Sequence, residues 1–397
     1  MSGTADSMHA SAPPRAASTF PTRYRDGADV RARFGDRVDR LGGYLWQSDP
    51  LADAAVETLV PGPAGDERVR AALAREAGVP AALRQLIEAA HEVPPWVEWE
   101  RLDRAGRFFL RTGLLGGIVL GARSLILGYA SPAGNKPLVL SGRLRAAAAP
   151  RLHETSRFVQ AVVRTGGMRV GADGWRITLR VRLMHAQVRR MILASPSWRR
   201  EAWGHPINQH DMVATSLLFS VFTLGGLRLL GADISPEESD DFMHLWRWVA
   251  QLMGTDPALI PTTEAEGFRL GELIAATQGP PDADSAALTA ALLEHATEHP
   301  DRVERERARK TLGLARALCR HLVGEELGDQ LGVPKTRERF LLPPAIATVR
   351  ALEKARRRSA RIEASLVESG TRYWDMVLKK GLAYATMDFS LPTSLGQ

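Results

Sequence analysis

Apolar residues recur at three-to-four residue spacing over most of the chain, which is the period of an α-helix packed against a core. Runs with the alternating pattern of a half-buried strand are nearly absent. The spacing predicts helices over residues 69–77, 81–90, 100–112, 150–164, 175–194, 209–230, 236–253, 263–277, 286–299, 302–322, 343–369 and 372–382. The sequence therefore predicts an all-α protein.

The chain is long enough for one large domain. It has 397 residues, of which 45% are hydrophobic, and this allows a sizeable core. Residues 1–24 are rich in Ala, Ser, Pro and Thr, so we expect them to be flexible. No long Pro/Gly linker and no fixed repeat of about 20 to 50 residues divides the rest. We expect a single helical domain over residues 25–397.

The charge pattern argues against a nucleic-acid partner. The formal net charge is +7, but the basic residues are interleaved with acids, as in RVERERARK at residues 302–310. This pattern is typical of a solvated helix face. The single cysteine, Cys319, allows neither an intrachain disulfide nor a thiolate metal cluster.

Two segments, 110–130 and 212–230, are apolar enough to be compared with membrane spans. The first carries Arg123 near its centre, and the second contains several Ser and Thr residues and an Arg. Buried helices explain them better than spans, which need about 20 largely apolar residues. The first residues also lack the apolar run of a secretory signal. We therefore expect no membrane span and a cytoplasmic location.

One histidine interrupts an apolar helix face. In the predicted helix 175–194, Val181, His185, Val188 and Ile192 fall within a narrow arc, which places the imidazole on the buried side. Its apolar neighbours cannot satisfy both ring nitrogens. Two explanations stay open at this point. His185 is either a neutral core histidine, hydrogen-bonded to a carbonyl and one other side chain, or a metal ligand such as the axial group of a haem iron.

The preceding predicted helix has a similar exception. Arg151 and Thr155 lie one turn apart on the face that they share with Phe158 and Val162. A buried guanidinium needs an anion or an acceptor nearby. Glu154 could supply it in a local ion pair. Alternatively, Arg151 and Thr155 face a buried imidazole from the neighbouring helix and polarise dioxygen on iron.

Other sequence signals for chemistry are weaker. Asn208 and Asp211 fit a helix start, with Asn208 as the capping residue. His205 and His210 could bind a metal, but no His or carboxylate at the i+4 position supports this. A nucleophile elbow, a phosphate-binding loop, a zinc-protease helix and a dinucleotide fingerprint are all missing from the sequence.

These residues together resemble the latex-clearing protein (rubber oxygenase) family, whose wider members include the oxygenase of mycophenolic acid biosynthesis. The likeness lies in the Arg151-x-x-x-Thr155 pair, in RVRLMHAQVRR around His185, and in NQHDMVATSLLFSVFTLGGLRLLG from Asn208 to Gly231. The stretch VPPWVEWERLDRAGRFF at residues 93–109 is similar to the lead-in of that family.

The resemblance implies an all-helical fold with a globin-like core and non-covalently bound haem b. It implies that His185 is the ligand of the haem iron, while Arg151 and Thr155 stand beside the haem in the distal pocket. The activity it implies is the use of dioxygen to cleave a C=C bond of an isoprenoid substrate.

Two positions depart from the pattern of latex-clearing members. Those members carry a Lys directly before the Thr, where this chain has Glu154. They also use a Glu as base in the segment before the Arg, whereas residues 131–150, SPAGNKPLVLSGRLRAAAAP, contain no carboxylate. We therefore take Glu154 as the candidate acid–base group. We also expect a smaller apolar molecule or secondary metabolite as substrate.

Three alternatives stay open. The first is a haem enzyme of the same fold that hydroxylates its substrate or is driven by peroxide. The second is a haem- or lipid-binding protein without turnover. The third is an all-α interaction protein in which the face carrying Arg151 and Thr155 is a satisfied internal network.

Overall fold

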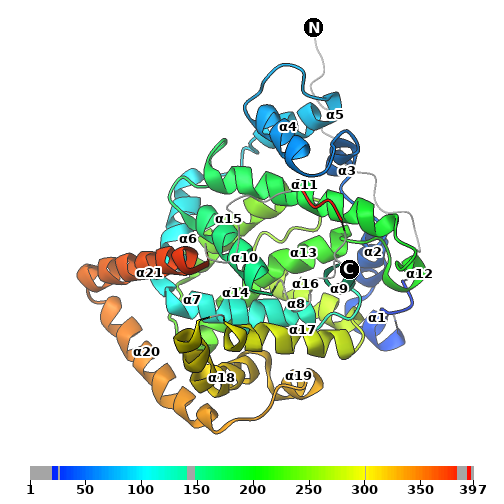
Figure 1. The fold of residues 1–397 in the computed structure, drawn as a ribbon. Coiled ribbons are helices and arrows are strands. Elements are labelled where there is room, and N and C mark those ends of the chain that lie inside the picture. The colour runs from blue at the N-terminus through cyan, green and yellow to red at the C-terminus, as the bar shows by residue number, and fades with distance from the viewer. Residues whose placement is uncertain (1–19, 26, 141–147, 300, 382–390, 395–397) are drawn as a thin grey trace.

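The computed structural model describes residues 20–25, 27–140, 148–299, 301–381 and 391–394, without the side chains of residues 148–151, 380 and 381. Within these ranges every regular element is a helix (Figure 1). The β-bridge between Tyr24 and Gln278 is isolated. The predicted all-α class is confirmed, and the globin-like core stays a prediction.

The first five helices are short, and the first three lie before residue 69, where no helix was predicted. They are α1 (Ala28–Phe34), α2 (Arg37–Tyr44), α3 (Pro50–Glu57), α4 (Pro63–Leu73) and α5 (Ala81–His91). Seven or eight residues, the length of the first three, are too few for a clear helical period. Phe20 and Tyr24 belong to the segment expected to be flexible, but both are buried. Residues 1–19 lie outside the described ranges.

The middle of the chain forms the body of the bundle. Its helices are α6 (Trp99–Thr112), α7 (Leu114–Val119), the π-helical turn η1 (Leu120–Ser124), α8 (Leu125–Tyr129), α9 (Lys136–Leu140), α10 (Ala148–Val163), α11 (Asp173–Leu193), α12 (Arg200–Trp203), α13 (Gln209–Phe219), α14 (Val221–Leu229), α15 (Pro236–Leu252) and α16 (Glu264–Thr277). Helix α10 packs against α6 and α11, and α15 packs against α6 and α11. In Figure 1, α11 crosses the bundle directly below α3, α4 and α5.

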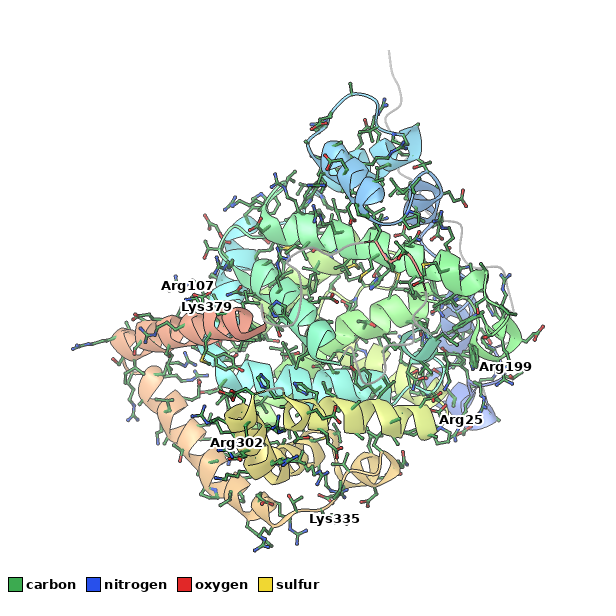
Figure 2. All side chains as sticks on the ribbon, in the orientation of Figure 1. Arg25, Arg107, Arg199, Arg302, Lys335 and Lys379 are labelled. Carbon is green, nitrogen blue, oxygen red and sulfur yellow. The ribbon has the colours of Figure 1, made fainter. Side chains whose placement is uncertain are left out.

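The remaining helices cover one side and one end of this body. They are α17 (Ala283–Glu294), the short turn η2 (His295–Glu298), α18 (Arg302–Val323), α19 (Glu325–Gln330), the short turn η3 (Arg337–Leu341), α20 (Leu342–Arg356) and α21 (Ala360–Gly381). Helix α21 packs against α6 and α10, whereas α20 lies at the edge of the molecule (Figure 1). The six cations labelled in Figure 2 lie at several different edges, in line with a dispersed positive charge.

The helix predicted over residues 209–230 is broken at Ser220. Its backbone leaves the helical region, with φ −101° and ψ −96°, and separates α13 from α14. The Ser220 hydroxyl donates to the Ser216 carbonyl at 2.8 Å, and the Thr223 and Ser124 hydroxyls both donate to the Leu218 carbonyl. Hydroxyl groups that donate hydrogen bonds to backbone carbonyls in this way compete with the helical hydrogen bonds.

The predicted boundary near residue 370 is wrong, because the chain breaks at residues 357–359 and α21 runs through Gly370 without interruption. A Cβ atom at Gly370 would lie 1.7 Å from the carbonyl oxygen of Leu110. The glycine therefore permits the close approach of α21 to α6 and does not end a helix.

One described helical stretch, Gln209–Leu229, is long and apolar enough to cross a membrane, and the bent pair Trp99–Thr112 and Leu114–Tyr129 would be a second. Half of the apolar window of the first stretch is buried in the protein.

Candidate functional site

His185 lies near the centre of α11 and is not hydrogen-bonded within the described part of the chain. Its Nδ1 atom is enclosed by protein and has no partner, whereas Nε2 is not enclosed in this way. Burial lowers the pKa of His185 to about 4, with a further contribution from the nearby Arg189 guanidinium. The imidazole is therefore neutral at physiological pH, which is the form that binds metals.

The face of α11 around His185 is open in its middle and closed at its ends. Val181 and Val188 are half-buried like His185, while Thr178 and Ile192, further along the same face, are buried. This pattern differs from the uniformly buried face predicted from the sequence, and it leaves accessible surface beside the ring.

Two buried arginines flank the histidine, one turn before and one turn after it. The Arg182 guanidinium donates to both carboxylate oxygens of Asp49, at 2.6 and 2.9 Å, and to the Leu252 carbonyl. Arg189 pairs with Asp53 and donates to the Pro206 and Ile207 carbonyls. Both arginines are almost completely buried. Since buried pairs of this kind have fixed geometry, they define the position of α11 against α3.

Asp49 has two roles in this arrangement. It is the N-cap residue of α3, where its side chain accepts from the Ala52 amide, and it is the partner of Arg182. Gly254 packs directly on the pair, because a Cβ atom there would lie 2.2 Å from Asp49 Oδ2. No room remains for another side chain at the pair. The backbone of Gly254, which follows α15, is also left-handed with φ +91°, so both the space and the conformation require glycine.

The neighbouring helix α10 carries the other candidate residues. Thr155 is half-buried, and no hydrogen bond of its hydroxyl is found in the described ranges. Glu154 is also half-buried. The side chain of Arg151 lies outside the described part, so its predicted place beside Thr155 and the ion pair with Glu154 stay predictions. Packing of α10 on α11 places the Thr155 and His185 helices in direct contact.

A second histidine, His153, lies on α10. It is buried, and its Nδ1 atom is enclosed without a partner. Burial lowers its pKa, and the nearby Arg157 lowers it further. His153 therefore resembles His185 in chemistry but belongs to the other helix, and it offers a matched comparison for experiments.

Aromatic side chains and one carboxylate hold α10 in place. Phe158 makes edge-to-face contact with Phe219 of α13, at 6.2 Å between ring centroids, and Phe219 stacks on Trp246 of α15. At the end of α10, Gln160 and Arg164 both donate to Asp375 of α21, at 2.7 and 3.0 Å. The helix opposite His185 is thus fixed by apolar packing and by α21.

The segment after α12 forms the predicted helix start. The Asn208 side chain accepts from the Asp211 amide at 2.9 Å, so the predicted cap is confirmed. His210 Nδ1 lies 3.0 Å from Asp211, and its Nε2 atom is enclosed without a partner. In the described ranges no group of three His, Cys, Asp or Glu residues has a geometry that could hold a metal ion.

Sequence reasoning missed Asp49 and Asp53. They lie more than 130 residues before their arginine partners, at the start of α3, which is too short to be recognised from the sequence. The available signal was the spacing of Arg182 and Arg189 on one side of an apolar helix, which requires buried acceptors but does not identify them.

The fold and the histidine helix define a class of helical proteins with a known family model. Residues 110–352 match the family described as ER-bound oxygenase mpaB/B'/Rubber oxygenase, catalytic domain. The match takes in more than half of the chain, together with α10 and α11, and the chain belongs to this family. The resemblance inferred from the sequence is confirmed.

Two individual relatives define the likeness more closely. The rubber oxygenase of Streptomyces sp. (strain K30) is 27% identical over 271 residues, which cover 65% of this chain and 62% of that protein. The match therefore spans less than two thirds of the relative's length. A solved structure of latex clearing protein LCP in the closed state has a TM-score of 0.67 and 21% identity, and the match covers 88% of this chain and 94% of that one. This second likeness supports the shared fold.

Proposed function

We propose that this chain is a haem b-dependent oxygenase in which His185 binds the iron and dioxygen oxidises an apolar, isoprenoid-like small molecule. The observation that carries the proposal is the state of His185, a neutral imidazole without a hydrogen bond and with accessible surface beside it. His153 also has an unpartnered Nδ1 but is buried, so the accessible surface beside the ring is what distinguishes His185.

The residues present fit a haem in other respects. Arg182 and Arg189 fix the helix on both sides of His185, as a metal-ligating side chain requires for a defined orientation. Val181 and Val188 offer apolar contacts to a flat apolar group beside the ring. Haem bound there would supply the redox chemistry by which dioxygen reacts with an alkene.

The side chains of α10 have separate roles in the proposal. With haem bound, the Thr155 hydroxyl would donate a hydrogen bond to the reacting oxygen, and the Arg151 guanidinium would stabilise negative charge on it. Glu154 takes up or releases a proton as the acid–base group. The substrate is oriented mainly by apolar packing between helices.

The cofactor part of the proposal is tested by the visible absorption spectrum of the purified protein after reconstitution with haem. We expect a Soret band that His185→Ala abolishes. His153→Ala is the matched control, because it removes a buried histidine with an unpartnered nitrogen from the neighbouring helix, and it should retain the band. A His185→Ala variant with the full haem spectrum would refute the proposal.

One observation favours a second reaction. Residues 131–150 contain no carboxylate, and Glu154 is the nearest acid after them. The second candidate is hydroxylation or peroxide-driven oxidation of a secondary metabolite at the same haem. Cleavage of C=C by dioxygen breaks the O–O bond and places both oxygen atoms in two carbonyl products. Hydroxylation adds one oxygen atom, and a reductant must supply two electrons so that the other leaves as water.

Product masses obtained with labelled dioxygen distinguish these reactions. Two labelled carbonyl fragments support cleavage, and a single added label supports hydroxylation. Ligand binding without oxygen consumption indicates a haem- or lipid-binding protein without turnover. The cytoplasmic location stays a prediction that fractionation of cells can test.

A further inference from the structure

Helix α13 connects the two sides of the candidate site. At its start, Arg189 of α11 donates to two carbonyls of the segment just before α13. At its end, Phe219 contacts Phe158 of α10 edge to face, with 6.2 Å between ring centroids. Phe158 lies one turn after Thr155 on the same face of α10. Helix α13 therefore runs from the helix of His185 to the Thr155 face of α10.

One strip of α13 stays accessible along this path. The helix packs against α2, α8, α14, α15 and α16, and Met212, Val213 and Leu217 are buried. Phe219 is half-buried, and Thr215, one turn before it, is exposed although α13 lies in the middle of the bundle (Figure 1). Since Phe219 faces α10, the strip formed by Thr215 and Phe219 lies on the side of α13 that faces the site.

The accessible strip ends at Phe219, because the rings behind it are closely packed. Phe219 stacks on Trp246 of α15 at 5.0 Å, and Trp246 contacts Phe158 and Phe242 at 6.2 Å each. Phe158, Trp246 and Phe242 are all buried, so Phe219 is the one ring of these four with accessible surface. An apolar group that lies beside Thr155 therefore meets the ring of Phe219 and finds no space behind it.

The break at Ser220 fixes the position of this ring. Phe219 is the last residue of α13, and the carbonyl of Leu218 before it accepts from the Ser124 and Thr223 hydroxyls, at 2.7 and 2.9 Å. The ring can leave its place only if these hydrogen bonds and the stacking on α15 are lost.

We propose that Phe219 is a specificity-determining residue, which closes one end of the substrate site and limits the length of the apolar chain bound beside Thr155. The site then takes a short isoprenoid chain whose end packs against this ring. A long chain is blocked by the rings of α10, α13 and α15. This inference rests on the proposed function for the identity of the site.

The experiment compares the binding of two saturated isoprenoid alcohols, tetrahydrogeraniol as the short one and phytanol as the long one. Neither has a C=C bond, so binding is measured without a reaction, by equilibrium dialysis of the full chain before and after reconstitution with haem. We expect the original chain to prefer the short alcohol. Phe219→Ala should raise the affinity for phytanol about tenfold, because about two further methylene groups can be buried where the ring was.

Phe219→Trp changes the same position in the opposite direction. Its larger ring intrudes on the bound chain and should weaken the binding of tetrahydrogeraniol about tenfold. A residue with a structural role alone would affect both alcohols equally in both variants. The affinity ratio therefore separates size selection from a loss of stability, which unfolding midpoints measure in parallel.

The matched control is Phe222→Ala. It removes a half-buried ring three residues later in the chain, which contacts Phe268 of α16 at 6.4 Å. This variant should keep the affinity ratio of the original chain.

Four outcomes would overturn the inference. They are binding of neither alcohol, equal affinity of the original chain for both alcohols, the same affinity ratio in Phe219→Ala as in the original chain, and an equal change of the ratio in Phe222→Ala. A ratio that shifts in opposite directions in the two Phe219 variants and stays constant in the control supports it. The Soret band tests the proposed function separately, so the two can fail independently.

Discussion

Helices α11 and α10 form the two sides of the candidate site, and they are held in opposite ways. Buried ion pairs with Asp49 and Asp53 hold the His185 helix. The helix that carries Thr155 is held by apolar packing and by the Arg164–Asp375 pair, whose side chains are 59% and 42% exposed. The His185 helix is therefore fixed by buried ion pairs, while the Thr155 helix depends on apolar packing and a partly exposed ion pair.

The ion-pair partners of both helices lie outside the matched family region. Asp49 and Asp53 precede residue 110, and Asp375 follows residue 352. The site residues themselves fall within that region. We infer that the residues before and after the matched region set how firmly each side of the site is held.

The largest effect is expected at Arg182. Arg182→Ala leaves Asp49 buried without its partner, and we expect a loss of about 3 to 5 kcal/mol of unfolding free energy. Urea unfolding followed by circular dichroism measures the loss. Arg189→Ala should cost less, because its partner Asp53 is 28% exposed. If Arg182→Ala costs no more than a surface change, α11 is not held by its ion pairs.

Acid should destabilise the fold in part through His185. The pKa of His185 is about 4 in the folded chain, against an ordinary value near 6.5, so the unfolded chain takes up a proton first as the pH falls. Without haem, this residue's contribution to stability is full above pH 6.5 and is lost progressively toward pH 4, by up to about 3 kcal/mol.

His185→Phe should flatten this part of the dependence of unfolding free energy on pH. The matched variant is His153→Phe on α10, because the pKa of His153 is also lowered. Any flattening in this variant measures how much His153 contributes to the pH dependence. An unchanged profile in His185→Phe would place the acid sensitivity elsewhere.

The packing of α21 gives a third test. Gly370→Ala brings a methyl group onto the Leu110 carbonyl, and α21 must move away from α6. We expect a cost of about 1 to 3 kcal/mol, as for other overpacked contacts. Because α21 also holds α10, substrate oxidation should be more impaired than haem retention. Equal losses of both would contradict the separation of the two sides.

The smallest effect is expected at Asp375. Asp375→Asn weakens its contacts with Gln160 and Arg164 at a largely exposed position, and the expected cost is about 1 kcal/mol or less. Thermal unfolding measures it, with Asp375→Glu as the conservative control. A cost as large as that of Arg182→Ala would remove the contrast between α10 and α11.

The helical class and the candidate histidine could be predicted because they depend on local spacing. The same holds for the Asn208 cap, whose donor and acceptor are three residues apart. Partners distant in sequence could not be predicted, as the Arg182–Asp49 pair shows. The predicted boundary near residue 370 is wrong because Gly370 allows helix contact rather than ending a helix, and only the position of Leu110 distinguishes the two.

The C-terminal residues of the described chain return to the histidine helix. Leu391 is buried, its amide donates to Asp66 of α4, and the Pro392 carbonyl accepts from Gln187 of α11. Gln187 is two residues from His185, so α11 obtains its full set of contacts only after residue 392 has been synthesised. This contact joins residues 205 positions apart in the chain, and a fusion partner placed directly after residue 392 would strain it.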